Sequence, residues 1–243
     1  MSRPDIVLLH GWGFNRLIWQ DFLPLLEPYY TVHCLDLPGF GKNTTIPNPY
    51  DLTALMDNIV AQAPEKAIYV GWSLGGLVAL MIAIHHAHRI TRLVNIASSP
   101  CFLQQEQWPG IKIEVLEKFS AELNLDYVKT IKRFLLLQFY HASVPSGMIK
   151  KLIQQVLSAP KPSSQTLNGG LKILKQTDLR PLLKKITCPQ HYLFGQLDTL
   201  APAKLLEPFK KFHPSAQYTV IEGAAHAPFL SHPHICLEAI QHV

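Results

Sequence analysis

The sequence has few cysteines and no long apolar run. Its four cysteines are spread over 243 residues, with no C-x-x-C pair and no histidine-rich neighbourhood. We therefore expect buried apolar thiols, and neither a metal site nor a disulfide framework. The longest apolar run, residues 77–84, falls far short of the roughly 18 residues that a membrane helix needs. No membrane association is expected.

The start of the sequence offers no export signal. Only residues 6–9 are continuously apolar there, and no small-residue cleavage site follows them, so a signal peptide is not expected. Residues of hydrophobic type make up 48% of the chain, enough to bury a core without metals or disulfides. The length suits one α/β domain, or a core domain with an inserted cap. We expect a cytoplasmic protein, with a monomer as the default.

The first part of the chain alternates between two patterns. Short β-branched, apolar runs alternate with segments that have apolar residues at helical spacing. Such alternation predicts a parallel sheet with helices on its faces. We expect strands at residues 6–9, 31–35, 67–70 and within 90–97, and helices at residues 19–26, 52–63 and 77–88.

The alternation then stops. From about residue 104 to residue 185 the patterns are helical only, and strand patterns resume at residues 191–194 and 217–221. The fold class predicted is α/β: a core of residues 1–103 and 186–243, with residues 104–185 inserted as an all-helical lid. Within the insertion we expect helices at residues 113–123, 126–140, 146–158 and 163–175.

A G-x-S-x-G motif, GWSLG at residues 71–75, follows an apolar strand and opens an apolar helix. This is the context of a nucleophile elbow, the sharp turn that presents the serine of an α/β-hydrolase. The turn needs small residues two before and two after the nucleophile, as Gly71 and Gly75 are. The alternative is a glycine-rich turn without chemistry. The sequence predicts Ser73 as a nucleophile.

A serine nucleophile needs a base, and the base needs an acid to orient it. In this fold the chain order is Ser, Asp or Glu, then His. His226 follows the last strand pattern, and Asp198 follows the strand before it. An N-capping aspartate is the alternative for Asp198. His232 and His234 are expected in a surface loop.

The oxyanion of the reaction needs two backbone N–H donors. One belongs to Leu74, the residue after the nucleophile, and the other to the loop after the first strand, where we assign it to Trp12. His10 is expected to shape that loop. Asp36 and Asp178 are poorer candidates for the acid, since one precedes Ser73 and the other lies in the helical insertion. The resulting acyl-enzyme mechanism uses no metal and no organic cofactor.

Positive charge is concentrated in the insertion. Residues 111–185 hold 13 Lys and Arg against 5 Asp and Glu, a net +8, while the rest holds 9 against 12, a net −3. A solvated helical face is the plain explanation. Over a site entrance, the same charge favours an acidic partner or substrate carrier. Nucleic acid is not expected, because no binding motif is present and the basic residues alternate with aliphatic ones.

Nine short segments along nearly the whole chain point to one family. They are HGWG (10–13), DLPGFG (36–41), GWSLGG (71–76), ASSPCF (97–102), WPGIK (108–112), RFLLLQ (133–138), LNGGL (167–171), DLR (178–180) and AHAPF (225–229). With these segments the chain resembles the pimeloyl-[acyl-carrier protein] methyl ester esterases of biotin synthesis, within the α/β-hydrolase superfamily. The more specific segments lie around or inside the insertion.

The resemblance implies a substrate, the methyl ester of a pimeloyl chain on acyl-carrier protein. It also implies a substrate pocket and a basic docking surface for the acidic carrier. The implied substrate-binding residues are Trp12, Ser73, Leu74, Phe134, Leu135, Leu136, Leu137, Gln138 and His226. The implied docking residues are Lys129, Arg133 and Lys150.

Two other functions stay open at the level of sequence. The same triad serves broad carboxylesterases and carbon–carbon bond hydrolases. A non-catalytic binding module is also possible in principle, because a fold alone does not establish activity. Dehalogenases and epoxide hydrolases of this fold usually place aspartate at the elbow, so Ser73 argues against both.

Overall fold

The fold is built on one parallel sheet. The computed structural model describes the chain except for residues 1–2, 143, 146 and 243. Its six strands have the order β2-β1-β3-β4-β5-β6, and every neighbouring pair is parallel. The strands are β1 (Asp5–Leu9), β2 (Thr31–Leu35), β3 (Ala67–Trp72), β4 (Ile90–Ile96), β5 (Gln190–Gly195) and β6 (Gln217–Ile221).

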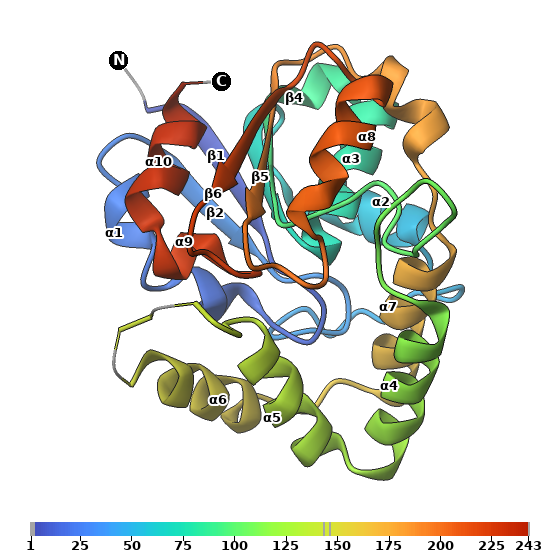
Figure 1. The fold of residues 1–243 in the computed structure, drawn as a ribbon. Coiled ribbons are helices and arrows are strands. Elements are labelled where there is room, and N and C mark those ends of the chain that lie inside the picture. The colour runs from blue at the N-terminus through green and yellow to red at the C-terminus, as the bar shows by residue number, and fades with distance from the viewer. Residues whose placement is uncertain (1–2, 143, 146, 243) are drawn as a thin grey trace.

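Helices cover both faces of the sheet, so its inner strands are largely buried. Every residue of β3 and β5 is buried, as expected for a parallel sheet covered on both sides. Helices α1 and α10 lie on one face, and α2, α3 and α8 on the other (Figure 1). These helices are α1 (Leu23–Leu26), α2 (Leu52–Gln62), α3 (Leu74–His85), α8 (Leu206–Phe212) and α10 (Pro233–Gln241).

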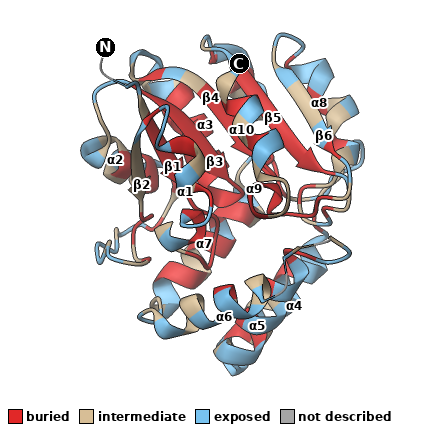
Figure 2. Cartoon of the chain, turned by 90° about the vertical axis from the view of Figure 1, so that its left-hand side faces the viewer, coloured by how far each residue is buried: buried red, intermediate tan, exposed pale blue. Residues whose placement is uncertain are grey.

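In the described part of the chain, four more α-helices lie between β4 and β5, where the sequence predicts only helices. They pack at one end of the sheet, and the outer sides of α4, α5 and α6 are largely exposed (Figures 1 and 2). Side-chain caps start two of them: Asp126 accepts from the N–H of Lys129, and Ser163 from that of Thr166. The helices are α4 (Ile113–Leu125), α5 (Tyr127–Leu137), α6 (Met148–Ser158) and α7 (Ser164–Gln176).

Several helix boundaries differ from those expected. The helix expected at residues 19–26 is two short pieces, η1 (Arg16–Trp19) and α1, because Pro24 has no N–H to donate and is tolerated only in a first turn. The helix expected at residues 126–140 ends at Leu137. His232 and His234 were expected in a loop, but Pro233 starts α10 between them. Among the described residues, no helix is long and apolar enough to cross a membrane.

Candidate active site

Ser73 lies on the sharp turn between β3 and α3. Its φ of 54° and ψ of −118° lie outside the usual regions for an L-residue. A Cβ on Gly71 would come within 2.5 Å of the Gly75 carbonyl oxygen, and one on Gly75 within 2.3 Å of the Leu9 carbonyl oxygen. Only glycine fits at either position. The local geometry is therefore the strand-elbow-helix arrangement that the motif predicts.

Asp198 and His226 meet although they follow different strands. Asp198 lies after β5 and His226 after β6, and Nδ1 of His226 is 2.8 Å from Oδ2 of Asp198. The other carboxylate oxygen accepts from the backbone N–H groups of Leu200 and Ala201. Both side chains are buried. Since Nδ1–H donates to the carboxylate, Nε2 of the imidazole is the atom left for chemistry.

That Nε2 atom is buried and has no hydrogen-bond partner among the described residues. His226 lies directly beside the elbow, because the Trp72 indole Nε1–H donates to its carbonyl oxygen at 2.7 Å. The indole and imidazole centroids are 5.7 Å apart. Ser73, His226 and Asp198 are thus brought together at the carboxyl ends of three strands, where sites in such sheets form.

The loop after β1 lies against the elbow. A Cβ on Gly11 would be 3.2 Å from Cβ of Ser73 and 3.0 Å from the Trp72 ring. Trp12 follows in this loop, and Leu74 is the first residue of α3, where backbone N–H groups have no partner within the helix. The loop that contains Trp12 and the first residue of α3, Leu74, therefore both adjoin Ser73.

His10 and Asp36 are structural. His10 is fully buried; its Nδ1–H donates to the Gly11 carbonyl, and its Nε2 accepts from the N–H of Leu37. Burial lowers the pKa of His10, which keeps the ring neutral. Asp36 accepts from the backbone N–H groups of Arg16 and Lys42. Both residues hold loops next to the site, as expected for His10.

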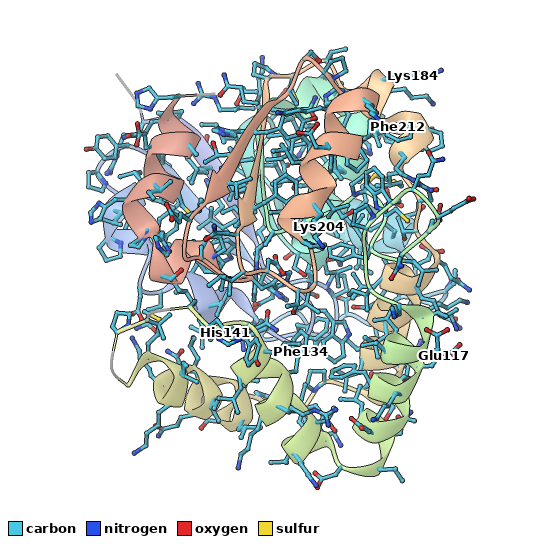
Figure 3. All side chains as sticks on the ribbon, viewed as in Figure 1. Glu117, Phe134, His141, Lys184, Lys204 and Phe212 are labelled. Atoms are coloured by element: carbon cyan, nitrogen blue, oxygen red, sulfur yellow. The ribbon has the colours of Figure 1, made fainter. Side chains whose placement is uncertain are left out.

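A cavity of about 540 Å³ opens over Ser73 between the sheet end and helices α4, α5 and α7. Its lining is mostly apolar, and Lys118 and Arg133 are its two cationic residues. Phe134 lies between α5 and the core (Figure 3), its ring 5.3 Å from that of Trp12. The apolar lining residues are Trp12, Phe102, Ile111, Val115, Leu116, Phe119, Phe134, Leu136, Leu137, Tyr140, Leu171, Leu174 and Leu200.

The residues of the RFLLLQ segment divide between two roles. Phe134, Leu136 and Leu137 line the cavity, whereas Leu135 is buried in the core. Gln138 is fully buried; its side-chain Nε2 donates to the carbonyl of Phe134, and its own carbonyl accepts from the N–H of His226. Gln138 is thus in contact with the His226 backbone and lies outside the cavity lining.

Most of the cavity lining on α4 and α7 has no motif in the sequence. Val115, Leu116 and Phe119 form the apolar side of an amphipathic helix, a signal that indicates burial without naming what the side faces. The LNGGL segment carries more information. A Cβ on Gly169 would come within 2.5 Å of the Tyr50 ring, and one on Gly170 within 2.5 Å of the Trp12 ring. The two glycines let α7 close one side of the cavity.

The three expected docking residues lie on α5 and α6. Lys129, Arg133 and Lys150 are exposed, and Arg133 pairs with Glu122. Their neighbour Lys151 instead pairs with Asp21 of the core at 2.5 Å. No ion pair is formed by Lys129 or Lys150 within the described part of the chain. Among the described residues, no group of three or more His, Cys, Asp or Glu side chains is arranged to hold a metal ion.

Known proteins share this fold. Residues 4–233 match the family described as the alpha/beta hydrolase fold. An esterase from Exiguobacterium antarcticum superposes with a TM-score of 0.88 over 99% of this chain and 91% of that one, at 23% identity. An enol-lactonase from Burkholderia xenovorans superposes with a TM-score of 0.82 over 99% and 91%, at 17% identity. At these identities the structures show the fold alone.

The chain is an ester hydrolase of the α/β-hydrolase family. Within that family it belongs with the pimeloyl-[acyl-carrier protein] methyl ester esterases. The protein of that name from Edwardsiella ictaluri is 43% identical over 96% of this chain and 90% of its own length. Its counterpart from Pectobacterium atrosepticum is 42% identical over 98% and 93%.

Proposed function

We propose that this chain hydrolyses the methyl ester of a pimeloyl chain carried on acyl-carrier protein, releasing methanol and the free distal carboxylate for biotin synthesis. The observation that carries the proposal is the Asp198–His226 pair next to the elbow of Ser73, which itself lines an apolar cavity beside basic helices. The relatives that share this chain's length carry that activity in their names.

In the proposed mechanism Ser73 is the nucleophile and His226 the general base. Nε2 of His226 takes the Ser73 hydroxyl proton as Oγ attacks the ester carbonyl, while Asp198 holds the ring through Nδ1. The backbone N–H groups of Trp12 and Leu74 stabilise the oxyanion. His226 then protonates the leaving methoxide, and methanol departs.

The second half of the cycle returns the enzyme to its starting state. His226 takes a proton from water, and the hydroxide attacks the acyl-Ser73 carbonyl. The tetrahedral intermediate collapses, Ser73 regains its proton from His226, and the pimeloyl carboxylate leaves. The steps use only side chains, backbone amides and water, so the proposal includes no cofactor.

The cavity suits a linear, uncharged acyl chain. Phe134, Leu136 and Leu137 supply apolar contacts, and burying each methylene of the substrate contributes about 0.8 kcal/mol. Leu135 and Gln138 are buried beneath these side chains and do not line the cavity. A free carboxylate at the ester end would have to leave water for this mostly apolar space, and that desolvation is costly. This difference favours the methyl ester as substrate and the acid as product.

Residues 104–185 serve, in this proposal, as the lid that admits the carrier. The exposed cations Lys129, Arg133 and Lys150 lie on α5 and α6, and an acidic carrier protein would be attracted to them. We propose a monomer acting in the cytoplasm. The site supports a monomer, because one chain supplies the triad and the whole cavity lining described above.

Methanol release from two substrates tests the proposal. Wild type and a Lys129→Glu, Lys150→Glu variant, which leaves the cavity lining intact, are compared on pimeloyl-carrier methyl ester and on free dimethyl pimelate. A Lys184→Glu, Lys185→Glu variant is the matched control, since Lys184 lies at the opposite end of the molecule from Phe134 (Figure 3). We expect the first variant alone to lose activity on the carrier ester, with the free ester unaffected.

Two other results have clear meanings. Equal activity on both esters, unchanged by the lid substitutions, would make this a general esterase with the same triad. No methanol from either ester would refute the proposed reaction.

A further inference from the structure

The peptide groups of His226 are held from two sides. The Trp72 indole N–H donates to the His226 carbonyl oxygen at 2.7 Å, and the His226 N–H donates to the Gln138 carbonyl oxygen at 3.1 Å. Trp72 is the last residue of β3, next to Ser73, and Gln138 is the C-cap residue that follows helix α5. The segment around His226 is therefore tied both to the nucleophile elbow and to the helical insertion.

Trp72 is itself immobilised. Its side chain is 1% exposed, and its ring lies 4.8 Å from that of Phe14 and 5.3 Å from that of Phe229. Gly11 closes off another side, since even a Cβ there would come within 3.0 Å of the indole. The indole has no room to turn, so the direction of its N–H is determined by packing.

The bond matters because of how the imidazole is anchored. The ring has one hydrogen bond, from Nδ1 to Asp198, and its Nε2 has no partner within the described residues. A ring anchored at one atom can pivot about that bond unless its Cα is also fixed. His226 lies in the connection between β6 and α9 (Pro228–Ser231), outside any regular element that would hold it. Its own peptide bonds therefore have to supply the second anchor.

We infer that Trp72 is a positioning residue for the base: its indole N–H holds the His226 peptide so that Nε2 faces Ser73. The inference rests on the proposed role of His226. It gives the second residue of the G-x-S-x-G motif a function beyond packing. Gln138 supplies the opposing contact from the insertion, and its side chain in turn holds the carbonyl of Phe134 in the cavity wall.

The chain contains a matched control for the test. Trp19 is fully buried in the same aromatic cluster, with its ring 4.2 Å from that of Phe229. Its Nε1 has no hydrogen-bond partner among the described residues. Trp19→Phe and Trp72→Phe therefore remove the same atoms from one cluster, but only the second removes a hydrogen bond to His226.

Three measurements are made on each variant: kcat and KM for the ester, the melting temperature, and the downfield proton NMR signal of the Nδ1–H···Asp198 bond. We expect Trp72→Phe to lower kcat by roughly 10- to 100-fold, the equivalent of one buried hydrogen bond lost in the transition state. KM should stay within about twofold, because the indole N–H does not contact the substrate and its loss does not weaken substrate binding. The NMR signal should broaden or shift in this variant and persist in Trp19→Phe.

A second replacement covers the case in which Trp72→Phe does not fold. Benzothienylalanine, introduced at position 72 or 19, keeps a fused two-ring side chain and has a sulfur atom, which cannot donate, in place of the N–H. The same loss of kcat at position 72, absent at position 19, is expected. Equal kcat at the two positions would overturn the inference, as would a loss of kcat with an unchanged Nδ1–H signal, which would point to Ser73.

Variants of Ser73 and His226 distinguish failure of the proposed triad from failure of the positioning role of Trp72. If Ser73→Ala and His226→Ala variants kept their activity, the proposed triad would be wrong and the inference would fall with it. If those variants are inactive and Trp72→Phe matches Trp19→Phe, the triad stands and only the positioning role of Trp72 is refuted.

Discussion

The Asp198 carboxylate meets Nδ1 of His226 at 2.8 Å across a sequence separation of 28 residues. Each residue follows a strand at the same edge of the sheet, and Asp198 is held by two backbone N–H groups of its own loop. The orientation of the imidazole is therefore established by the fold before any substrate binds. This preorganisation is what a general base needs.

Replacing Asp198 by asparagine should preserve the fold and remove most of the activity. The amide oxygen would keep the N–H groups of Leu200 and Ala201, which would turn the amide nitrogen toward Nδ1 of His226. Nδ1 would then accept, and the proton would sit on Nε2, where the base must be free. We expect kcat to fall by about 10⁴-fold with little change in melting temperature. Wild-type kcat in this variant would contradict the assignment.

Replacing Ser73 by alanine should remove nearly all turnover. Alanine keeps the Cβ that the elbow already accommodates, so the fold should survive, while the nucleophile is lost. The expected loss is roughly 10⁴-fold or more. A fluorophosphonate probe should label wild type at Ser73 and leave the variant unlabelled. Labelling of wild type at another serine would identify a different nucleophile.

Replacing Gly170 by alanine should destabilise the protein although alanine favours helices. The gain in helix propensity is about 1 kcal/mol. The new Cβ would lie 2.5 Å from the Trp12 ring, which is itself held by an indole bond to the Leu167 carbonyl. Overpacking of this kind costs about 1–3 kcal/mol.

We expect a lower melting temperature and a higher KM for Gly170→Ala, because Trp12 also lines the cavity. Gln165→Ala, at an exposed position of the same helix, is the control and should show neither effect. A rise in melting temperature for Gly170→Ala would show that α7 moves freely away from Trp12.

The stability of the protein should fall as the pH is lowered through about 6.5. Burial lowers the pKa values of His10, His191 and His213, whereas the unfolded chain has histidine pKa values near 6.5. Between the folded and unfolded values, the unfolded state binds more protons, so stability increases with pH in that window. Urea midpoints at pH 5.5 and 7.5 would measure the slope, and His10→Gln should reduce it. An unchanged slope would exclude His10 as a contributor.

Activity on the carrier ester should depend on salt, and activity on the free ester should not. The screening length falls from about 10 Å at 0.1 M to about 3 Å at 1 M ionic strength. If the exposed cations Lys129 and Lys150 attract an acidic carrier, KM for the carrier ester should rise with salt while kcat holds. Equal salt responses for both esters would argue against electrostatic docking.

The sequence alone was sufficient to predict the parallel sheet, the elbow at Ser73 and the positions of Asp198 and His226. These depend on local rules. Buried parallel strands are continuously apolar, the elbow needs glycine on both sides of its serine, and residues that follow parallel strands gather at one edge. The helical content of residues 113–176 followed from the spacing of apolar residues for the same reason.

Only the tertiary structure decided which apolar side chains face the cavity. Leu135 and Leu136 are adjacent leucines of one helix, yet one lies in the core and the other lines the cavity. Helical spacing shows that a side is apolar, but its partner depends on how α5 packs against α4 and the sheet. The bond from Trp72 to His226 likewise joins residues 154 positions apart. Such contacts have no local signal, because they arise only when separate strands are placed side by side.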